Sequence, residues 1–314
     1  MHSSRPDTDV LDASSSVPPA RPSTAADPLT GRTGPNAWRL YRATGPTRDG
    51  AAAPGPQPPP VQPPPVLLLH GVTDSGECWP GTVRHLVRTR DVLTLDARGH
   101  GGSELPDEPF TLAALADDAA RAVRDVLGRP AVVVGHSMGG LTAQELALRH
   151  PDLVLGLVLE DPAWGVLDAQ HDEGGRPLFL APGIEAARGR PTAELAADFR
   201  ARFPQWSPEE SEPWARAQRA VSPRLLEVPH EWTPRDWPVA FDGRVPVVVA
   251  AGEASSYSLV PDDGARRAEQ VLAGRGRVVR VAGAGHCVRR DDLGTFLGLV
   301  DELLAEVEGS MIGG

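Results

Sequence analysis

Six short apolar runs, rich in Val and Leu, follow one another along the chain with helical patterns between them. The runs occupy residues 66–69, 92–95, 131–134, 156–159, 245–250 and 277–281, and helices are predicted at 111–127, 138–149 and 291–308. Runs with so little polar alternation are typical of parallel strands buried on both faces of a sheet. Alternating strands and helices therefore predict an α/β fold around a mostly parallel sheet. A shorter alternating segment, Trp38–Arg42, is predicted to be an edge strand.

Composition distinguishes a folded core from an N-terminal tail, a Pro-rich stretch and an aromatic-rich segment. Residues 1–35, rich in Ser, Pro, Asp and Ala, are predicted to be a disordered tail. Residues 36–161 and 243–314 are predicted to be the two parts of the core. A Pro-rich stretch at 45–65 indicates an extended surface linker, with a ligand for an SH3-like domain as the alternative. Residues 162–242 show no clear strand and hold five of the seven Trp, which predicts a helical lid over an apolar pocket.

The strongest chemical signal is a Gly-x-Ser-x-Gly motif at residues 135–139. It directly follows one buried run and directly precedes a predicted helix. In so sharp a strand-to-helix turn the central residue is strained, and its neighbours two positions away must be small, as Gly135 and Gly139 are. Ser137 is therefore the predicted nucleophile, with an ordinary serine in a tight turn as the alternative.

A serine hydroxyl is a weak nucleophile and needs a general base. His286 follows the last apolar run and precedes the last predicted helix, which places it at the same sheet edge as Ser137. The other histidines fall in the tail, in tight loops, in predicted helices or in the lid segment. His286 is therefore the predicted base, and a histidine of a surface loop is the alternative.

The developing oxyanion needs two preorganised N–H donors. One is predicted to be the backbone of Met138, the residue after the nucleophile. The other is predicted in the loop after the run at 66–69, where Gly71 lets the backbone turn towards Ser137 and Val72 presents its N–H.

These segments together resemble the α/β-hydrolase superfamily, in particular its lidded, esterase-like members. The resemblance covers roughly residues 38–308, and the segments occur in the family's order: His70-Gly71, Asp96–Ser103, Gly135–Gly139 and Gly283–His286. It implies the α/β-hydrolase fold. It also implies that Asp96–Ser103 is a structural turn, so that His100 is architectural and not catalytic.

The acid of the triad departs from the family's usual pattern. Members commonly place an Asp after the strand that here ends at Ala250, but Ser255 stands at the expected position. Asp262 and Asp263 are less favoured, because they fit the first turn of the next helix, where the helix dipole favours acidic residues.

The predicted acid is Asp161, which follows the run at 156–159. Glu160 is the alternative, because side chains alternate across a strand and only one of the two can face His286. An acid at this point resembles the placement in a minority of the superfamily, including zearalenone-type lactonases and some haloalkane dehalogenases.

The predicted activity is therefore hydrolysis of a carboxylic ester or lactone of a fairly apolar substrate, through an acyl-enzyme at Ser137. Ser137 argues against dehalogenase and epoxide hydrolase chemistry, for which an Asp would stand at the turn. Amide hydrolysis, C–C bond hydrolysis, acyl transfer and non-catalytic ligand binding remain alternatives on the same scaffold. The residues predicted to line the substrate pocket are Trp164, Trp206, Trp214 and Trp232.

Charge and cysteine content argue against several other classes of protein. A net charge of −11 is unfavourable for binding nucleic acid or an anionic membrane surface. Cys78 and Cys287 are too few for a disulfide framework or a four-cysteine zinc site, and are predicted to be buried thiols, with a redox-sensitive pair as the alternative. No phosphate loop, dinucleotide fingerprint or metal-ligand spacing occurs, so neither cofactor nor metal is predicted.

Two further patterns bear on location. No apolar run approaches the roughly 18 residues that a membrane span needs, and no signal peptide is evident at the N-terminus. We therefore expect a cytoplasmic protein with a small-molecule substrate; its oligomeric state is left open.

Overall fold

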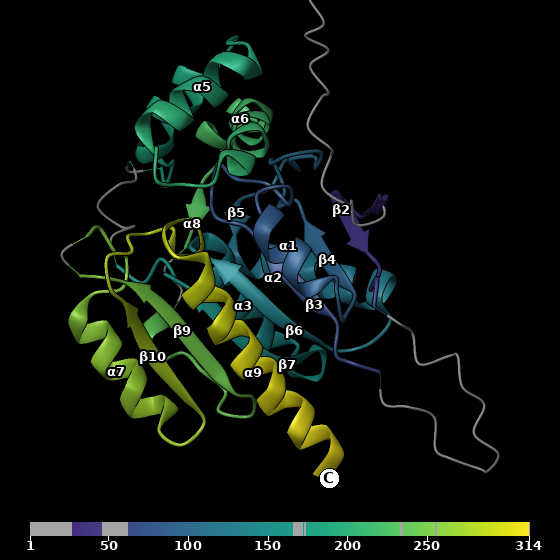
Figure 1. Ribbon diagram of the computed structural model, residues 1–314. Helices are drawn as coiled ribbons and strands as arrows, with labels where there is room; N and C mark the ends of the chain where they lie inside the picture. Colours follow the sequence, from purple (N-terminus) through teal and green to yellow (C-terminus); the bar gives the residue numbers. More distant parts are fainter. Residues whose placement is uncertain are drawn as a thin grey trace, which may run out of the picture.

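A computed structural model describes residues 27–45, 62–165, 172, 174–232, 235–254 and 256–313. The predicted tail up to residue 26, most of the Pro-rich stretch and Ser255 lie outside these residues. An eight-stranded sheet, in the order β1-β2-β4-β3-β6-β7-β9-β10, forms the centre of the molecule (Figure 1). Its strands are β1 Leu29–Thr33, β2 Asn36–Tyr41, β3 Val66–Leu69, β4 Val92–Leu95, β6 Ala131–His136, β7 Val154–Glu160, β9 Val247–Gly252 and β10 Gly276–Val281.

Six neighbouring strands of this sheet, β4, β3, β6, β7, β9 and β10, pair in parallel with one another. β2 runs antiparallel to both of its neighbours, β1 and β4. This confirms the α/β fold with a mostly parallel sheet that the six apolar runs predict. The ends of those six strands differ from the predicted runs by at most two residues.

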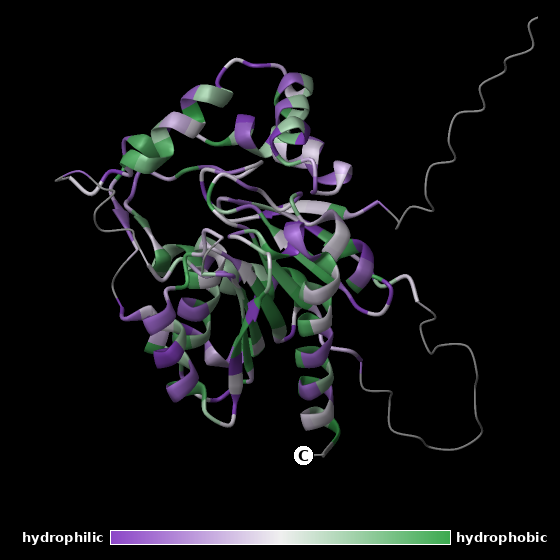
Figure 2. Ribbon diagram, turned by 60° about the vertical axis from the view of Figure 1, so that its left-hand side comes forward, coloured by the Kyte–Doolittle hydropathy of each residue, from purple (hydrophilic) through white to green (hydrophobic). Residues whose placement is uncertain are grey.

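Helices cover both faces of the sheet, and alternate strand residues point to each. One face is covered by α2 Leu112–Ala122, α3 Met138–Arg149 and α7 Asp262–Leu272, and α2 continues as a π turn at Val123–Leu127. These helices share an apolar cluster with Leu67, Val133 and Val249 of the strands. Leu68 and Val134 pack on the other face against α1 Pro80–Leu86, α8 Val288–Asp291 and α9 Leu293–Gly313. Figure 2 shows the apolar strands enclosed between these layers.

The prediction of a disordered tail over residues 1–35 is wrong for Leu29–Thr33, which form β1. β1 pairs with β2 through a tight hairpin in which Gly34 has a φ of 53°. A Cβ on Gly31 would lie 2.3 Å from the Trp38 ring, so the hairpin packs closely on that side chain. The strand predicted at Trp38–Arg42 is therefore not the edge, because β1 lies outside it.

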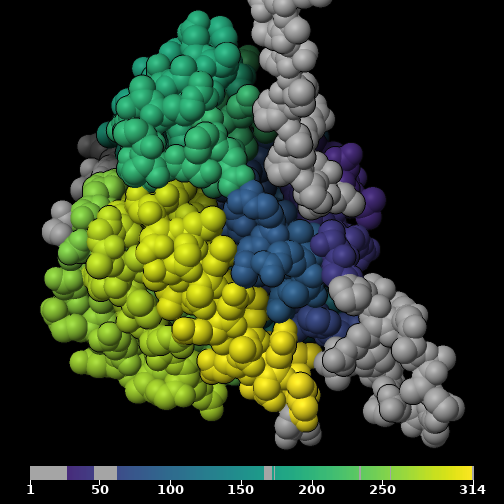
Figure 3. Space-filling view, in the orientation of Figure 1, coloured from purple at the N-terminus to yellow at the C-terminus, as the bar shows by residue number. Residues whose placement is uncertain are grey.

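Residues 162–242, here called the helical insertion, connect β7 to β9. Its α-helices are α4 Ala181–Ala187, α5 Thr192–Arg202 and α6 Ser211–Ala220, and Figure 3 shows this part of the chain as a teal lobe above the rest. The insertion also holds one short strand that the sequence did not predict, β8 His230–Glu231, paired with β5 Phe110–Thr111. Trp232 and Leu225 of the insertion share an apolar cluster with Met138 and Leu141 of α3, which brings the insertion against the predicted nucleophile turn.

Within the described residues, no helix combines the length and the apolar character that crossing a membrane requires.

Candidate active site

The predicted nucleophile turn lies between β6 and α3, at the carboxyl ends of the parallel strands. Ser137 has a φ of 54° and a ψ of −114°, a conformation that strains a residue with a side chain. A Cβ on Gly135 would lie 2.2 Å from the Gly139 carbonyl oxygen, and one on Gly139 would lie 2.1 Å from that of Leu69. Both positions therefore require glycine. The Ser137 N–H donates to the Glu160 carbonyl oxygen at 3.0 Å, which fastens the turn to β7.

The backbone N–H groups of Val72 and Met138, the residues that follow Gly71 and Ser137, have no hydrogen-bond acceptor among the described residues. Met138 is the first residue of α3, where the N–H has no partner within the helix. A Cβ on Gly71 would lie 3.3 Å from Ser137 Cβ, so the backbone before Val72 approaches the nucleophile directly. Unpaired donors held in place beside a nucleophile are what an oxyanion site requires.

His286, in the loop between β10 and α8, contacts Asp161, the residue after β7. His286 Nδ1 lies 2.6 Å from Asp161 Oδ2. The buried carboxylate also accepts hydrogen bonds from Gly252 N at 2.9 Å, Ser258 Oγ at 2.5 Å and Leu259 N at 2.8 Å. Because an ionised carboxylate can only accept, His286 Nδ1 carries the proton and Nε2 presents its lone pair. The carboxylate thereby fixes both the orientation and the tautomer of the ring.

His136 joins the nucleophile turn to the loop that carries His286. His136 Nε2 donates to the His286 carbonyl oxygen at 3.0 Å, and the two ring centroids are 4.8 Å apart. Burial and the nearby positive charge of Arg289 hold the pKa of His136 well below its usual range, so the ring stays neutral. The Ser137 hydroxyl has no hydrogen bond to another described residue. Hydrogen bonds of this kind often tighten only when a substrate is bound.

The other acids considered from the sequence lie elsewhere. Both carboxylate oxygens of Glu160 accept from Arg289, from its backbone N–H and its Nη1, each at 2.8 Å. Burial raises the pKa of Glu160, and the bonds from Arg289 oppose that rise. Asp262 and Asp263 lie in the first turn of α7, as the sequence indicates. Among all the acids considered from the sequence, only Asp161 forms a hydrogen bond with His286 in the described part of the chain.

Two of the predicted pocket tryptophans are engaged in packing. Trp232 is 3% exposed, and its Nε1 donates to His230 Nδ1 at 3.1 Å. Trp164 donates from Nε1 to Gln144 Oε1 at 2.8 Å, which ties the start of the insertion to α3. Their role as substrate contacts stays a prediction.

The other two lie between the helices of the insertion. Trp206 stacks on Phe203, with centroids 3.9 Å apart, and donates to Asp291 Oδ1 at 2.5 Å. Trp214 lines a groove of about 570 Å³ between α4, α5 and α6. Gln218 lines the same groove and donates to the Thr73 carbonyl oxygen at 3.0 Å, so the groove adjoins the loop that carries Val72.

The Asp96–Ser103 segment forms a closed turn. Ser103 Oγ donates to the Asp96 carbonyl oxygen at 2.7 Å, and Gly102 N donates to Asp96 Oδ2 at 2.9 Å. His100 is fully buried in this turn and bonds the Arg98 carbonyl oxygen through Nδ1 at 3.0 Å. Its contacts are those of an architectural residue.

The two cysteines are free thiols near the site. Burial raises the pKa of Cys287 to about 12 and also raises that of Cys78, so both stay protonated at neutral pH. No group of His, Cys, Asp and Glu side chains suited to a metal ion occurs in the part of the chain that the structure describes.

Sequence reasoning missed four polar residues packed around the site: Asp74, Glu210, Arg289 and Arg290, all buried. Nothing in the sequence marks these residues, because each is surrounded by ordinary loop or helix composition. Only the fold shows that their side chains meet.

Fold and site together have the features of the α/β hydrolases. Residues 66–295 match the alpha/beta hydrolase family, and the chain belongs to it. A hydrolase from Pseudomonas aeruginosa PA01 has a similar structure, with a TM-score of 0.64 and 23% identity, over 90% of this chain and 99% of that one.

Two curated relatives match over shorter segments. Lipase LipV of Mycobacterium tuberculosis is 41% identical over 98 residues, or 31% of this chain and 37% of that protein. The sn-1-specific diacylglycerol lipase ABHD11 of Xenopus tropicalis is 39% identical over 134 residues, or 41% of this chain and 38% of that protein. The matches thus span less than half the length of either relative.

Proposed function

We propose that this protein is a serine hydrolase that cleaves carboxylic esters, with Ser137 as nucleophile, His286 as general base and Asp161 as the acid of the triad. The observation that carries the proposal is the 2.6 Å contact between His286 Nδ1 and Asp161 Oδ2, at the sheet edge where Ser137 occupies its strained turn. An Asp that orients a His in this way prepares it to take the proton of a serine hydroxyl.

The reaction follows from these positions. Ser137 Oγ attacks the acyl carbonyl carbon while its proton moves to His286 Nε2, and Asp161 stabilises the resulting imidazolium. The N–H groups of Val72 and Met138 donate to the oxyanion of the tetrahedral intermediate. His286 then protonates the departing alkoxide, which leaves the acyl group on Ser137. A water molecule then attacks the acyl carbonyl carbon while losing a proton to His286 Nε2. His286 returns that proton to Ser137 Oγ as the bond between the acyl carbon and Oγ breaks and the acid is released.

The surroundings support a fairly apolar substrate. Val72 and Met138 pack into the apolar cluster that also contains Leu180, Ile184 and Trp232 of the helical insertion. Two of the curated relatives are named as lipases, one of them as an sn-1-specific diacylglycerol lipase. These observations favour an ester with an apolar acyl chain, and they favour the helical insertion as the lid over it.

A lactone is the second candidate substrate. It is supported by the position of the acid directly after β7, which resembles the placement in zearalenone-type lactonases. Opening a lactone uses the same steps, except that the leaving alkoxide stays attached to the acyl group.

Labelling with a fluorophosphonate probe, followed by mass spectrometry of the modified peptide, tests the proposal. We expect one modification, at Ser137, and none in Ser137→Ala. p-Nitrophenyl esters of increasing chain length and macrocyclic lactones, assayed side by side, then separate the two substrate classes. A cooperatively folded sample that neither reacts with the probe nor hydrolyses any of these compounds would show the proposal to be wrong.

A further inference from the structure

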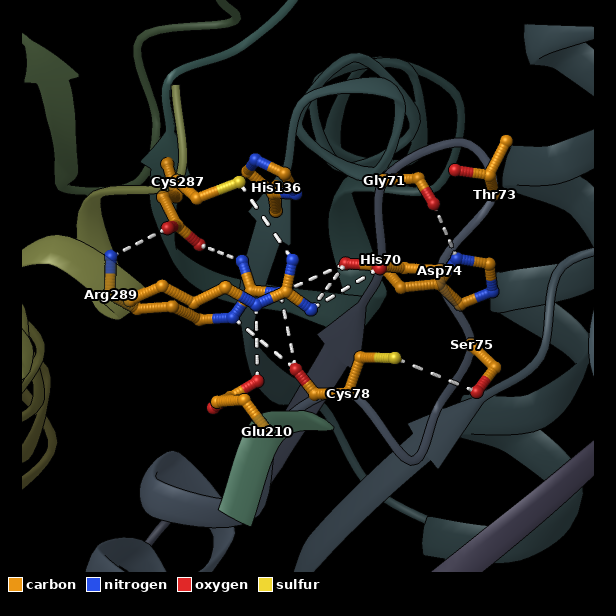
Figure 4. Close-up of polar contacts among 12 residues, drawn as sticks. His70, Gly71, Thr73, Asp74, Ser75, Cys78, His136, Glu210, Cys287 and Arg289 are labelled. Atoms are coloured by element: carbon orange, nitrogen blue, oxygen red, sulfur yellow. Dashed lines mark hydrogen bonds and ion pairs between the residues drawn. The ribbon is translucent and has the colours of Figure 1, made fainter. Parts of the chain in front are cut away.

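Five charged side chains are buried together beside the proposed triad, and we call them the buried charge cluster: Asp74, Glu160, Glu210, Arg289 and Arg290. Their exposed fractions range from 0 to 8%. The loop after β3 contributes Asp74, the end of β7 contributes Glu160, α8 contributes both arginines, and the helical insertion contributes Glu210. Figure 4 shows Asp74, Glu210 and Arg289 gathered in one place. The cluster therefore joins the loop that carries Val72, the end of β7 next to Asp161 and the helix that follows His286 to the insertion.

Arg289 connects β7 to the loop after β3. Its Nη1 donates to Glu160 Oε2 at 2.8 Å, and its Nη2 donates to Asp74 Oδ2 and to the Cys78 carbonyl oxygen, each at 3.1 Å. The guanidinium lies 4.1 Å from the centroid of the Trp79 ring. These contacts hold the guanidinium between β7 and the loop after β3.

Arg290 connects the same loop to the helical insertion. Its Nη2 donates to both Asp74 oxygens, at 3.2 and 3.1 Å, while its Nε donates to Glu210 Oε2 at 3.1 Å. It also lies 5.5 Å from the centroid of Trp206, another residue of the insertion. Arg290 is thus shared between the loop and the insertion.

Asp74 is the meeting point of the two arginines. Burial acts to raise the pKa of its carboxyl, but the guanidiniums of Arg290 and Arg289 outweigh this, so the pKa lies below its usual range. The carboxylate is therefore charged at neutral pH. Its own N–H donates to the Gly71 carbonyl oxygen at 3.1 Å, which closes the turn that contains Val72.

We propose that Asp74, held between Arg289 and Arg290, is a positioning residue that aims the Val72 N–H at the oxyanion, and that the Arg290–Glu210 pair couples this alignment to the seating of the helical insertion. Stability alone accounts poorly for such a cluster, because well-packed apolar side chains often replace buried ion pairs without loss. The charged hydrogen bonds instead fix the orientation of the connected segments, since each bond holds one segment in a defined position relative to another. The kinetic part of this inference rests on the proposed function.

The test compares wild type with Asp74→Asn, Glu210→Gln and the double variant. The matched control is Asp118→Asn, because Asp118 is also buried and bonded to two arginines, Arg98 and Arg121, neither of which belongs to the buried charge cluster. Two quantities are measured: hydrogen exchange of the peptide covering residues 70–76, and kcat and KM for p-nitrophenyl butyrate.

We expect Asp74→Asn to lower kcat by at least about 10-fold with KM within about 3-fold, because a misdirected oxyanion donor weakens binding of the transition state more than of the substrate. Exchange of the 70–76 peptide rises in the same variant. Glu210→Gln gives a smaller change of the same kind, and the double variant falls short of the sum of the two effects, because both act through Arg290. Asp118→Asn changes neither kcat nor exchange of this peptide.

Several results would overturn the inference. If Asp74→Asn matches Asp118→Asn in exchange and in kcat, Asp74 does not position the loop. If the effects of Asp74→Asn and Glu210→Gln add, the insertion is not coupled to it. Should Asp74→Asn fail to fold, Arg290→Lys carries the test, because a lysine keeps the charge but lacks the fork that bonds both carboxylates. If the wild type turns over no ester, the proposed function fails while the exchange data still decide the positioning role.

Discussion

The imidazole of His136 lies against that of His286, with centroids 4.8 Å apart, and its Nε2 donates to the His286 backbone carbonyl oxygen. The residue before the proposed nucleophile therefore holds the main chain of the proposed base. Asp161 fixes the ring of His286 from one side, and His136 fixes its backbone from another. The distance between Ser137 and His286 depends on both.

Replacing His136 by Leu is expected to lower kcat for an ester by about 10-fold, since a lost hydrogen bond is worth roughly 1 kcal/mol and the loop is freed. The rate at which a fluorophosphonate labels Ser137 compares the variant with the wild type without requiring substrate turnover. His136→Asn, which keeps a donor, should recover part of the rate. Equal rates for the wild type and both variants would contradict this role.

Asp161→Asn is expected to lower turnover by about 10³-fold or more, because an amide cannot hold His286 in the right tautomer or stabilise its imidazolium. Asp262→Asn is the control, because the Asp262 side chain is 64% exposed and bonds Arg280 at 2.8 Å rather than His286. Its turnover should stay within about 2-fold of the wild type, as is usual for an exposed ion pair of little energetic weight. Comparable losses in the two variants would refute the assignment of the acid.

Ser137→Gly is expected to be more stable than Ser137→Ala by about 1 kcal/mol, because glycine adopts the backbone angles of this position without steric strain. Both variants lack the hydroxyl, so the comparison separates strain from chemistry. Chemical denaturation of the two proteins measures the difference. Equal midpoints would show that the turn stores no strain at residue 137.

The free energy of unfolding is expected to fall as the pH drops below about 6.5. Burial, together with the charge of His70, lowers the pKa of His100 to about 3, whereas an unfolded histidine titrates near 6.5. Between these values the unfolded chain binds a proton that the folded chain does not, so acid favours unfolding.

His100→Asn should reduce the slope of this fall by up to about 1.4 kcal/mol per pH unit. Urea unfolding at several pH values between 4 and 7 measures the two slopes. Parallel curves for wild type and variant would show that His100 is not the titrating group.

Much of the fold was predictable because the central strands are buried on both faces, which leaves unbroken apolar runs such as Ala131-Val-Val-Val134 and Val247-Val-Val-Ala250. β1 was not predictable, because Leu29–Thr33 is short and mostly polar, and its pairing depends on β2. The short β8 is likewise defined by its partner, β5, which lies far away in the sequence.

The candidate site was predictable to the extent that local sequence defines it. The turn around Ser137 needs glycines at fixed spacing, and His286 follows a strand at the expected point. The choice between Glu160 and Asp161 depends on where β7 ends, and Asp161, with a φ of 39°, turns out of the strand towards His286. The buried charge cluster was beyond prediction, because Arg290 meets Asp74 across 216 positions and Glu210 across 80.

β1 also has a consequence for handling the protein. Because the outermost strand presents mostly exposed, polar residues, a second molecule finds little there to add to, and this guards against edge-to-edge association. A chain shortened to begin at Pro35 would leave the backbone of β2 open, with the Trp38 side chain released from Gly31. We expect such a truncated protein to self-associate through its sheets even with every proposed catalytic residue in place, and light scattering of the purified protein would show it.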